Sequence, residues 1–485
     1  MSRDIEQTLE HTVARSTLSS PQIQSLWKSD INWERAEKYV RRLQERIYQH
    51  TTNKHWQKVR NLQKLLGRSY FAKVVAIREV TQRNTGKNTP GIDGRTYSTS
   101  EERWSLTKEP FNYLTDKPMP LRRVFIPKQN GSQRPLSIPT IHDRIMQMII
   151  KFVLEPEWEA KFETNSYGFR PGRRTMDAID QIRNNIGRKF STQWILDADI
   201  SKCFDTISHQ FLLNQIPTFT KIISKWLKAG VIEFGTYAET DKGTPQGGII
   251  SPLLANIALH GMENIFRYQN SIKLVRYADD FVVMANSKEI LENYVIPKIK
   301  SFLEERNLNL NELKTTIIHR NEGFNFLGFE IRYLQKYNNQ KSFLLIQPPK
   351  IKVSKVLQHI KAILKSINYK TLSEVIISLN WVIRGWCYYY QFSNAKQRFR
   401  YLQNGIFQIA WKALRRKHPT KGSNWIIKTY FKTEEKNRWI LFDNNFKLFS
   451  PESVHVRRYI KVNEYYSPFD RSKREYWKSR LKANV

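Results

Sequence analysis

The sequence is 485 residues long and carries 80 Lys and Arg residues against 44 Asp and Glu residues, a formal net charge of +36. Hydrophobic residues make up 40% of it, which is enough for sizeable cores and excludes a wholly disordered chain. Two cysteines, Cys203 and Cys387, are too few for a disulfide framework or a multi-cysteine zinc module. No apolar run is long enough for a transmembrane helix, and the N-terminus lacks the apolar stretch of a secretory signal. We therefore expect a protein of the cytoplasm or of an organelle interior, with no membrane association and with a polyanionic partner.

The positive charge is concentrated in the last third of the chain. Residues 345–485 hold 29 Lys and Arg residues and 8 Asp and Glu residues, a net charge of +21. They also hold six of the thirteen tryptophans, which are Trp381, Trp386, Trp411, Trp425, Trp439 and Trp477. Basic side chains interleaved with aromatic ones suit phosphate contacts and base stacking, so this part predicts nucleic-acid binding. The alternative is a solubilised surface over ordinary tryptophan cores.

The first half of the chain predicts helices, two strands and basic loops. Apolar residues at helical spacing predict a helix over 33–48 and a second one over 56–80. Gly, Asn and Pro-Gly residues mark 82–94 as a turn-rich loop, and 121–139 predicts two strands around the Asn130-Gly131 turn. A long helix is expected over 141–162. The basic loop 166–174 precedes another helix.

Acidic residues interrupt two apolar strands further along. The segment 194–200 predicts a strand on which Asp197 and Asp199 share one face. The segment 272–285 predicts a hairpin with Asp279 and Asp280 at its tip. Two adjacent aspartates between strands often form an ordinary exposed turn. Carboxylates from separate strands, however, supply the hard oxygen ligands that magnesium needs.

Ordered motifs resemble those of a group II intron-encoded reverse transcriptase. The most specific are Tyr277-Ala-Asp-Asp280, Gly243-Thr-Pro-Gln-Gly-Gly248 and Ala198-Asp-Ile200. Further blocks match in order at 84–94, 126–139, 166–173, 313–315 and 326–329, and the segments 379–386 and 411–425 resemble the thumb, or maturase X domain. The resemblance runs from about residue 30 to the C-terminus.

The resemblance implies a right-hand polymerase of the α+β class. Its palm contains an antiparallel sheet and its thumb is helical. The expected boundaries are an N-terminal helical extension over 1–58, fingers over 59–190, palm over 191–344, thumb or maturase X domain over 345–425, and a DNA-binding remnant over 426–485. The implied function is RNA-directed DNA synthesis together with binding of the protein's own intron RNA as a maturase, which assists splicing and retrohoming.

The same resemblance assigns roles to residues of the reaction site. Asp199, Asp279 and Asp280 match the catalytic triad that would hold two magnesium ions. Asp197 shares the face of Asp199 and remains its competitor; the Ala-Asp-Ile match alone favours Asp199. Lys314 matches a lysine near the pyrophosphate leaving group and would act as general acid, whereas its alternative is a solvated lysine at a helix end.

Four residues match positions around the incoming deoxynucleoside triphosphate. Phe204 would lie under the sugar and exclude a 2′-hydroxyl, and Gln246 would lie against nucleotide and template. Lys128 and Arg134 match fingers residues that grip the triphosphate, since an ammonium and a guanidinium both suit phosphate oxygens.

Basic residues of the 166–174 loop and of the C-terminal third are the candidate contacts to intron RNA and target DNA. They are Arg170, Arg173, Arg415, Arg416, Lys417, Arg457, Arg458, Lys473 and Arg474. Many members of the family continue into an HNH-type endonuclease with paired Cys-x-x-Cys motifs, and no such motif occurs here, so we expect no cleavage of the opposite target strand by this chain. Two alternatives stay open: a splicing cofactor with a vestigial polymerase, and a domesticated reverse transcriptase in antiphage defence.

Overall fold

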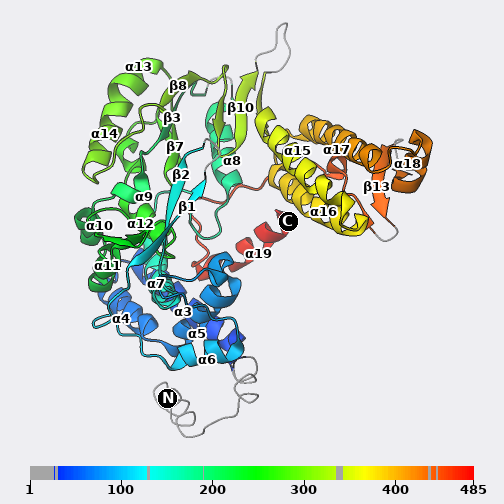
Figure 1. The fold of residues 1–485 in the computed structure, drawn as a ribbon. Coiled ribbons are helices and arrows are strands. Elements are labelled where there is room, and N and C mark those ends of the chain that lie inside the picture. The colour runs from blue at the N-terminus through cyan, green and yellow to red at the C-terminus, as the bar shows by residue number, and fades with distance from the viewer. Residues whose placement is uncertain are drawn as a thin grey trace.

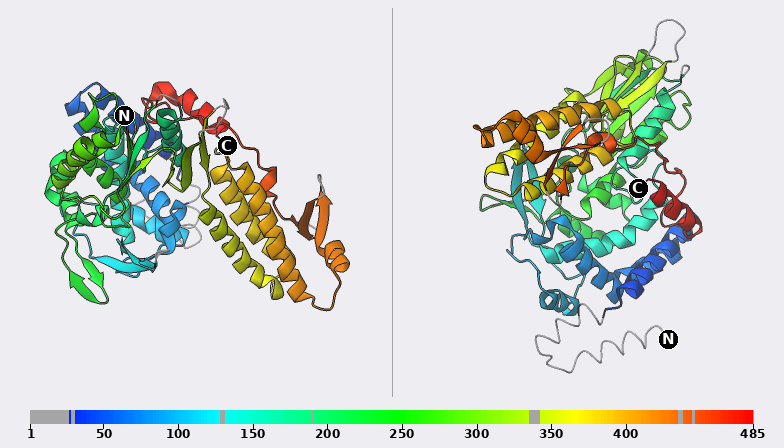
Figure 2. Two further views of the ribbon diagram at one scale, coloured as in Figure 1. Left: turned by 90° about the horizontal axis from the view of Figure 1, so that it is seen from above. Right: turned by 90° about the vertical axis from the view of Figure 1, so that its right-hand side faces the viewer.

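A computed structural model gives the fold and describes residues 27, 31–127, 131–188, 191–334, 342–434, 438–443 and 446–484. Helices and small sheets alternate along these ranges, which confirms the predicted α+β class. In Figure 1 the N-terminal helices lie at the base, strands lie above them, and a bundle of long helices projects to one side. The left view of Figure 2 shows this bundle extending away from the rest of the chain.

The N-terminal part is a helical layer. Its helices are α3 (Trp33–Thr52), α4 (Trp56–Gly67), α5 (Tyr70–Arg78) and α6 (Ser100–Lys108), with a π-helical turn at Glu79–Arg83 and a 3₁₀ turn at Thr85–Asn88. The predicted first helix is confirmed, and it packs Val40 and Leu43 against α4, α5 and α7. The single helix predicted over 56–80 is wrong. The chain breaks before α5 because the Ser69 hydroxyl accepts a hydrogen bond from the Ala72 backbone N–H and starts a new helix.

A four-stranded sheet follows, in the order β2-β1-β4-β5. Its strands are β1 (Leu121–Pro127), β2 (Gln133–Ile138), β4 (Val231–Glu233) and β5 (Thr236–Ala238). The predicted β1–β2 hairpin is confirmed, whereas its tip, residues 128–130 with Lys128, lies outside the described residues. The predicted long helix is α7 (Ile141–Glu159), capped by the Thr140 hydroxyl.

The central sheet has the order β6-β7-β3-β8 and is antiparallel throughout. Its strands are β3 (Trp194–Asp199), β6 (Lys273–Tyr277), β7 (Asp280–Ala285) and β8 (Thr316–His319), so the predicted strand and hairpin are both confirmed. Residues Phe281 to Ala285 are all buried, because apolar side chains cover both faces of β7.

Helices surround this sheet in the chain and in space. They are α8 (Thr175–Ile186), α9 (Cys203–Thr206), α10 (His209–Gln215), α11 (Thr220–Leu227), α12 (Ser251–Ala258), α13 (Lys288–Ile290) and α14 (Ile296–Glu304). Shorter turns lie at Glu263–Phe266 and Leu291–Val295. Leu196, Ala198 and Phe281 belong to one apolar cluster with α12, whereas Ile195 and Val282 belong to a second cluster that continues into the helical bundle.

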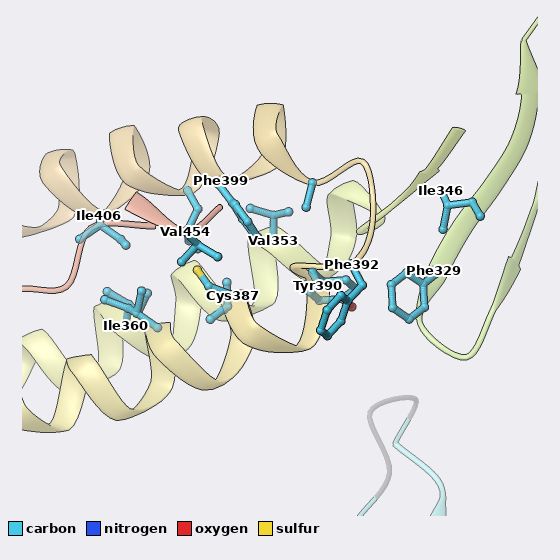
Figure 3. Packing of buried hydrophobic residues seen from close by; sticks show 14 of the residues in the cluster. Phe329, Ile346, Val353, Ile360, Cys387, Tyr390, Phe392, Phe399, Ile406 and Val454 are labelled. Atoms are coloured by element: carbon cyan, nitrogen blue, oxygen red, sulfur yellow. The ribbon is translucent and has the colours of Figure 1, made fainter. Parts of the chain in front are cut away.

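The projecting bundle follows a three-stranded sheet of β9 (Phe324–Phe326), β10 (Phe329–Leu334) and β11 (Phe343–Gln347). The bundle consists of α15 (Lys350–Leu364), α16 (Leu372–Tyr390) and α17 (Lys396–Lys417), with a 3₁₀ turn at Lys365–Asn368. Figure 3 shows Cys387 of α16 between Val353 and Ile360 of α15 and Phe399 of α17. Burial raises the pKa of the Cys387 thiol to about 12, so this cysteine acts as an apolar core residue.

The chain then forms a small outer sheet and returns to the N-terminal helices. The outer elements are α18 (Ser423–Tyr430), β12 (Phe431–Glu434), β13 (Arg438–Asp443), β14 (Phe446–Lys447) and a 3₁₀ turn at Pro451–Ser453. The returning segment, residues 456–484, is called the tail below; it ends in a 3₁₀ turn at Arg471–Lys473 and in α19 (Arg474–Ala483), which lies beside α3 in Figure 1. No helix of the described ranges is both long and apolar enough to cross a membrane.

Candidate active site

Three aspartates lie at one end of the central sheet. Asp199 is the last residue of β3 and lies directly opposite Asp280, the first residue of β7. Asp279 directly precedes Asp280 and lies in the two-residue turn that joins β6 to β7. Its neighbour Ala278 has a φ of 60°, a left-handed conformation that a non-glycine residue adopts only when its surroundings hold it there. The two acidic motifs are therefore brought together as predicted.

Burial and neighbouring negative charge destabilise the charged forms of Asp279 and Asp280. Burial, followed by the negative charges of Asp279, Asp199 and Asp197, raises the pKa of Asp280 to about 6. Burial and the charge of Asp199 also raise the pKa of Asp279. Lys314 Nζ donates a hydrogen bond to Asp199 Oδ2 at 2.5 Å, and this bond raises the pKa of the lysine. This end of the sheet therefore carries surplus negative charge, which Lys314 partly neutralises.

This charge surplus and the donor chemistry fit a divalent cation. Carboxylate oxygens are the ligands that magnesium prefers. As the side chains stand, no three His, Cys, Asp or Glu residues of the described ranges are gathered closely enough to hold a metal ion. The Asp199 carboxylate is instead bonded to Lys314. Cation binding would need the aspartates to turn toward one another and Lys314 to yield.

Asp197 differs from Asp199 in its place on β3. Asp197 lies between Val282 on β7 and Thr316 on β8, inside the sheet. Asp199, in contrast, is the last residue of β3 and lies beside the turn between β6 and β7. Burial and then the charge of Asp199 raise the pKa of Asp197 to about 6. Because Asp197 lies inside the sheet, Asp199 is the better candidate to act together with Asp279 and Asp280.

The three aspartates lie inside a domain that matches a known protein family. Residues 126–331 match the reverse transcriptase (RNA-dependent DNA polymerase) family, residues 27–109 its N-terminal domain, and residues 353–431 the group II intron maturase-specific domain. The chain is 32% identical to protein YkfC of Escherichia coli K12 over 54% of its own length and 81% of that protein. The chain belongs to the group II intron-encoded reverse transcriptases.

Two further relatives place the chain in this family. It is 30% identical to the group II intron-encoded protein LtrA of Lactococcus lactis over 51% of its own length. The match spans 53% of the length of LtrA. It is 28% identical to maturase-like protein 1 of Euglena gracilis over 75% of its own length and 77% of that protein. The reverse transcriptase domain indicates RNA-directed DNA polymerase activity.

Two of the four residues expected around the nucleotide, Arg134 and Gln246, belong to a chain of hydrogen bonds between β2 and α9. Arg134 Nε donates to Gln246 Oε1 at 2.9 Å, and Gln246 Nε2 lies 3.4 Å from both carboxylate oxygens of Asp205. Asp205 was not predicted, although it follows Phe204 directly in the sequence. The Phe204 ring is buried and meets the Phe169 ring edge-on at 6.3 Å between centroids. Lys128 lies outside the described residues.

Several cations predicted to bind nucleic acid are engaged within the protein. Arg170 is buried and pairs with both oxygens of Glu159, at 2.7 and 3.1 Å, an arrangement that does not favour the predicted contact with RNA. Burial lowers the pKa of Arg173 to about 10, and its Nη2 donates to the carbonyl of Glu464 in the tail. Arg474 pairs with Glu45 of α3 at 2.6 Å, but half of its side chain stays exposed, so its contact with nucleic acid stays a prediction.

The remaining candidate cations are exposed, with one exception. Arg415, Arg416, Arg457 and Arg458 are exposed. Lys417 is exposed at the end of α17, and its ammonium donates to the Ile367 carbonyl at 2.8 Å. Lys473 is half-buried over the Tyr466 ring. The exposed pairs on α17 and on the tail therefore stay the best candidates for contacts to nucleic acid.

Proposed function

We propose that this chain is an RNA-directed DNA polymerase whose carboxylates Asp199, Asp279 and Asp280 hold two Mg²⁺ ions. The pairing of Asp199 with Asp280 across two central strands, with Asp279 in the adjoining turn, carries the proposal. These ions, when bound, would neutralise the triphosphate and make the primer 3′-hydroxyl a better nucleophile. Asp197, inside the sheet, would not be a ligand.

The other residues of the site would bind and orient the deoxynucleotide. Arg134 would exchange its bond to Gln246 for the triphosphate oxygens, and Lys128 would add a second cation. Phe204 would pack under the sugar. The primer 3′-hydroxyl would lose its proton to water as its oxygen bonds to the α-phosphorus. As the bond to pyrophosphate breaks, Lys314 would give its ammonium proton to the leaving oxygen. The hydrogen bond to Asp199 keeps that proton on Lys314 until the site fills.

The experiment is extension of oligo(dT) on poly(rA) with magnesium. Asp279→Asn and Asp199→Asn should each abolish DNA synthesis and leave the melting temperature and RNA affinity nearly unchanged. Glu292→Gln is the matched control, because this carboxylate is half exposed and pairs with Lys288 on the protein surface. DNA synthesis by Asp279→Asn at the rate of the control would overturn the assignment.

We further propose that the C-terminal third binds the group II intron RNA and target DNA, as a maturase that assists splicing and retrohoming. Support comes from the net charge of +21 over 345–485 and from tryptophans that reach the surface. Trp381 on α16 is 78% exposed, and Trp425 and Trp439 are partly exposed. Exposed rings beside cations suit base stacking with phosphate contacts. The proposed compartment is the cytoplasm or an organelle interior, where the RNA is made.

Salt titration tests this second proposal. Reversing the charges of Arg415 and Arg416 should weaken binding of intron RNA and reduce the slope of log affinity against log salt by about one per lost phosphate contact. Reversal of Lys298, on the outer helix α14, is the control. Equal affinity and equal slope for the wild type and the double reversal would contradict the placement of the RNA on α17.

A further inference from the structure

Arg276 is a fully buried arginine directly behind the carboxylate turn. It lies on β6, two residues before Ala278, and its side chain is 1% exposed. Its Nη1 donates to the Ala278 carbonyl at 3.1 Å and to Asn256 Oδ1 at 3.0 Å. The guanidinium therefore holds the backbone of the turn residue whose φ is positive.

Asn256 extends this contact to a second segment. It lies on α12, and its Nδ2 donates to the Gly168 carbonyl at 2.8 Å. The loop containing Gly168 is also tied to β6 by the backbone: Tyr167 N–H donates to the Arg276 carbonyl, and Arg276 N–H donates to the Asn165 carbonyl, each at 2.9 Å. Side chains and backbone together thus join β6, α12 and the 165–168 loop behind the turn.

A positive charge at this place is costly for the fold. Burial lowers the pKa of Arg276, and among the described residues its Nη2 has no hydrogen-bond acceptor. The nearby Glu163 compensates in part: burial alone would raise the Glu163 pKa, but the hydrogen bond with His260 and the charge of Arg276 hold it at about 2. An apolar residue would avoid this desolvation, so the arginine needs a reason beyond packing.

We propose that Arg276 and Asn256 form a brace that fixes the Ala278 carbonyl and thereby positions the Asp279 carboxylate for cation binding. The inference rests on the proposed polymerase function and adds two positioning residues to it. Without the brace, a buried carbonyl loses its donor and Ala278 is free to leave its left-handed conformation. The Asp279 side chain then no longer starts from a fixed backbone position from which it can turn toward Asp199 and Asp280.

The test compares Arg276→Met and Arg276→Lys with a matched control, Arg320→Met. Arg320 is also a buried arginine that donates to backbone carbonyls, those of Ile186 and Arg188. It lies at the opposite end of β3, where its backbone N–H bonds to the Gln193 carbonyl. The readouts are melting temperature, Mn²⁺ affinity by calorimetry in the absence of substrates, and kcat and KM for DNA synthesis.

Arg276→Met should weaken Mn²⁺ binding and lower kcat, each by roughly tenfold or more, with KM for primer–template little changed. Arg276→Lys keeps one donor and should recover part of both losses. Arg320→Met should lower the melting temperature and leave Mn²⁺ affinity as in the wild type. Unchanged Mn²⁺ affinity in both Arg276 variants, or an equal loss in Arg320→Met, would overturn the brace.

The two proposals fail in different ways. A wild-type protein that binds Mn²⁺ but makes no DNA would overturn the proposed function, and the Mn²⁺ measurement would still decide the brace. If Arg276→Met does not fold, Arg276→Lys decides. Wild-type Mn²⁺ affinity together with wild-type kcat in Arg276→Lys would mean that the guanidinium has no positioning role.

Discussion

Gly168 lies against the backbone of Ala278 so closely that a side chain would not fit between them. A Cβ built on Gly168 would stand 2.3 Å from the Ala278 nitrogen and 2.8 Å from the Tyr277 carbonyl carbon. Both neighbours are backbone atoms of the β6–β7 turn, so neither can move aside as a flexible side chain would. The 165–168 loop therefore sets the position of the turn that carries Asp279.

Gly168→Ala should displace this turn and lower kcat for DNA synthesis by roughly a hundredfold, because a shift of about 1 Å at reacting groups has that effect. Steady-state kinetics with magnesium, normalised to the folded fraction by circular dichroism, measures it. Gly385→Ala on α16 is the control, since no atom lies within 4 Å of its added Cβ. That change should raise the free energy of unfolding by roughly 0.5–1 kcal/mol. Equal kcat in both variants would contradict the steric argument.

Asp197→Asn should change the pH dependence of stability, which tests the place of Asp197 on β3. The folded-state pKa of Asp197, about 6, lies above the ordinary value of 3.8, because burial and the charge of Asp199 oppose ionisation. The folded state therefore binds this proton more tightly, so its contribution to stability is present below pH 4 and is lost as pH rises to about 6. Asparagine removes that loss, and the melting temperature without divalent metal should rise at pH 8 and change little at pH 4.

DNA synthesis distinguishes this variant from its neighbour. Asp197→Asn should retain synthesis, whereas Asp199→Asn should lose it. A variant at position 197 that melts as the wild type does at pH 8, or that loses all synthesis, would contradict the place of Asp197 inside the sheet. Melting curves at pH 4, 6 and 8 and one extension assay are sufficient.

Phe204→Val should relax the choice between deoxyribonucleotides and ribonucleotides. The ring is 8% exposed and is held edge-on against Phe169, so it presents a fixed wall. Removing it opens space for a 2′-hydroxyl, and relative ribonucleotide incorporation should rise roughly tenfold. Phe266→Val is the control, because this buried ring lies in the 3₁₀ turn before β6. It should lower stability and leave the incorporation ratio as it is.

The sequence allowed the carboxylate edge to be predicted because its signals are local. Alternating acidic and apolar residues around Asp197 and Asp199, and an acidic pair between apolar runs, determine strands and faces without long-range information. The break at Ser69 was missed because apolar spacing continues through it, and a hydroxyl cap leaves no trace in periodicity. Arg276 was missed because an arginine in a short strand is usually expected at the surface.

The engaged cations could not be predicted from charge alone. Arg474 is 429 residues from its partner Glu45, and the pairing arises only because the tail returns to α3. Arg170 lies near Glu159 in sequence, but its burial depends on how the 166–174 loop turns back on the last residue of α7. Composition gives the amount of charge in a segment, whereas burial decides which cations still face a nucleic acid.

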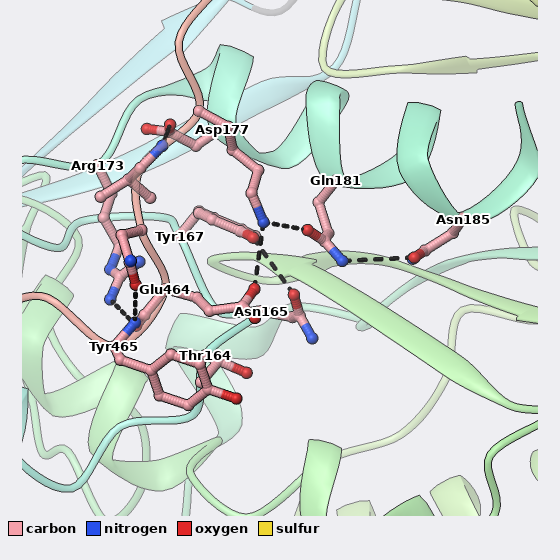
Figure 4. A network of polar contacts seen from close by, with 12 residues as sticks. Thr164, Asn165, Tyr167, Arg173, Asp177, Gln181, Asn185, Glu464 and Tyr465 are labelled. Atoms are coloured by element: carbon pink, nitrogen blue, oxygen red, sulfur yellow. Dashed lines mark hydrogen bonds and ion pairs between the residues drawn. The ribbon is translucent and has the colours of Figure 1, made fainter. Parts of the chain in front are cut away.

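The tail is anchored on Asp177, a fully buried carboxylate of α8. Its Oδ1 accepts from Arg480 Nη2 at 2.6 Å and from the Val462 N–H at 2.7 Å. Figure 4 shows Arg173 beside the tail residue Glu464, to whose carbonyl it donates. Arg480 also donates to the Gly172 carbonyl at 2.9 Å. The Arg457 N–H donates to the Gln391 carbonyl, so the tail joins the inner end of the bundle, between α16 and α17, to the loop beside the active site.

Arg480→Met should release this anchor and leave Asp177 as an unpaired buried charge. The side chains of the pair are 4% and 0% exposed, so solvent screens their interaction little. Breaking such a pair lowers the free energy of unfolding by roughly 3–5 kcal/mol. Urea denaturation measures the loss, and limited proteolysis should cut the tail between 456 and 484 sooner than in the wild type.

A control on the same helix separates anchoring from charge. Lys478 and Glu475 pair at 2.8 Å on the outside of α19, with side chains 69% and 85% exposed. Lys478→Met removes the same charge and should change stability by less than about 1 kcal/mol. The tail would be a solvated extension, and not part of the folded body, if both variants unfolded at the wild-type urea concentration and gave the wild-type cleavage pattern.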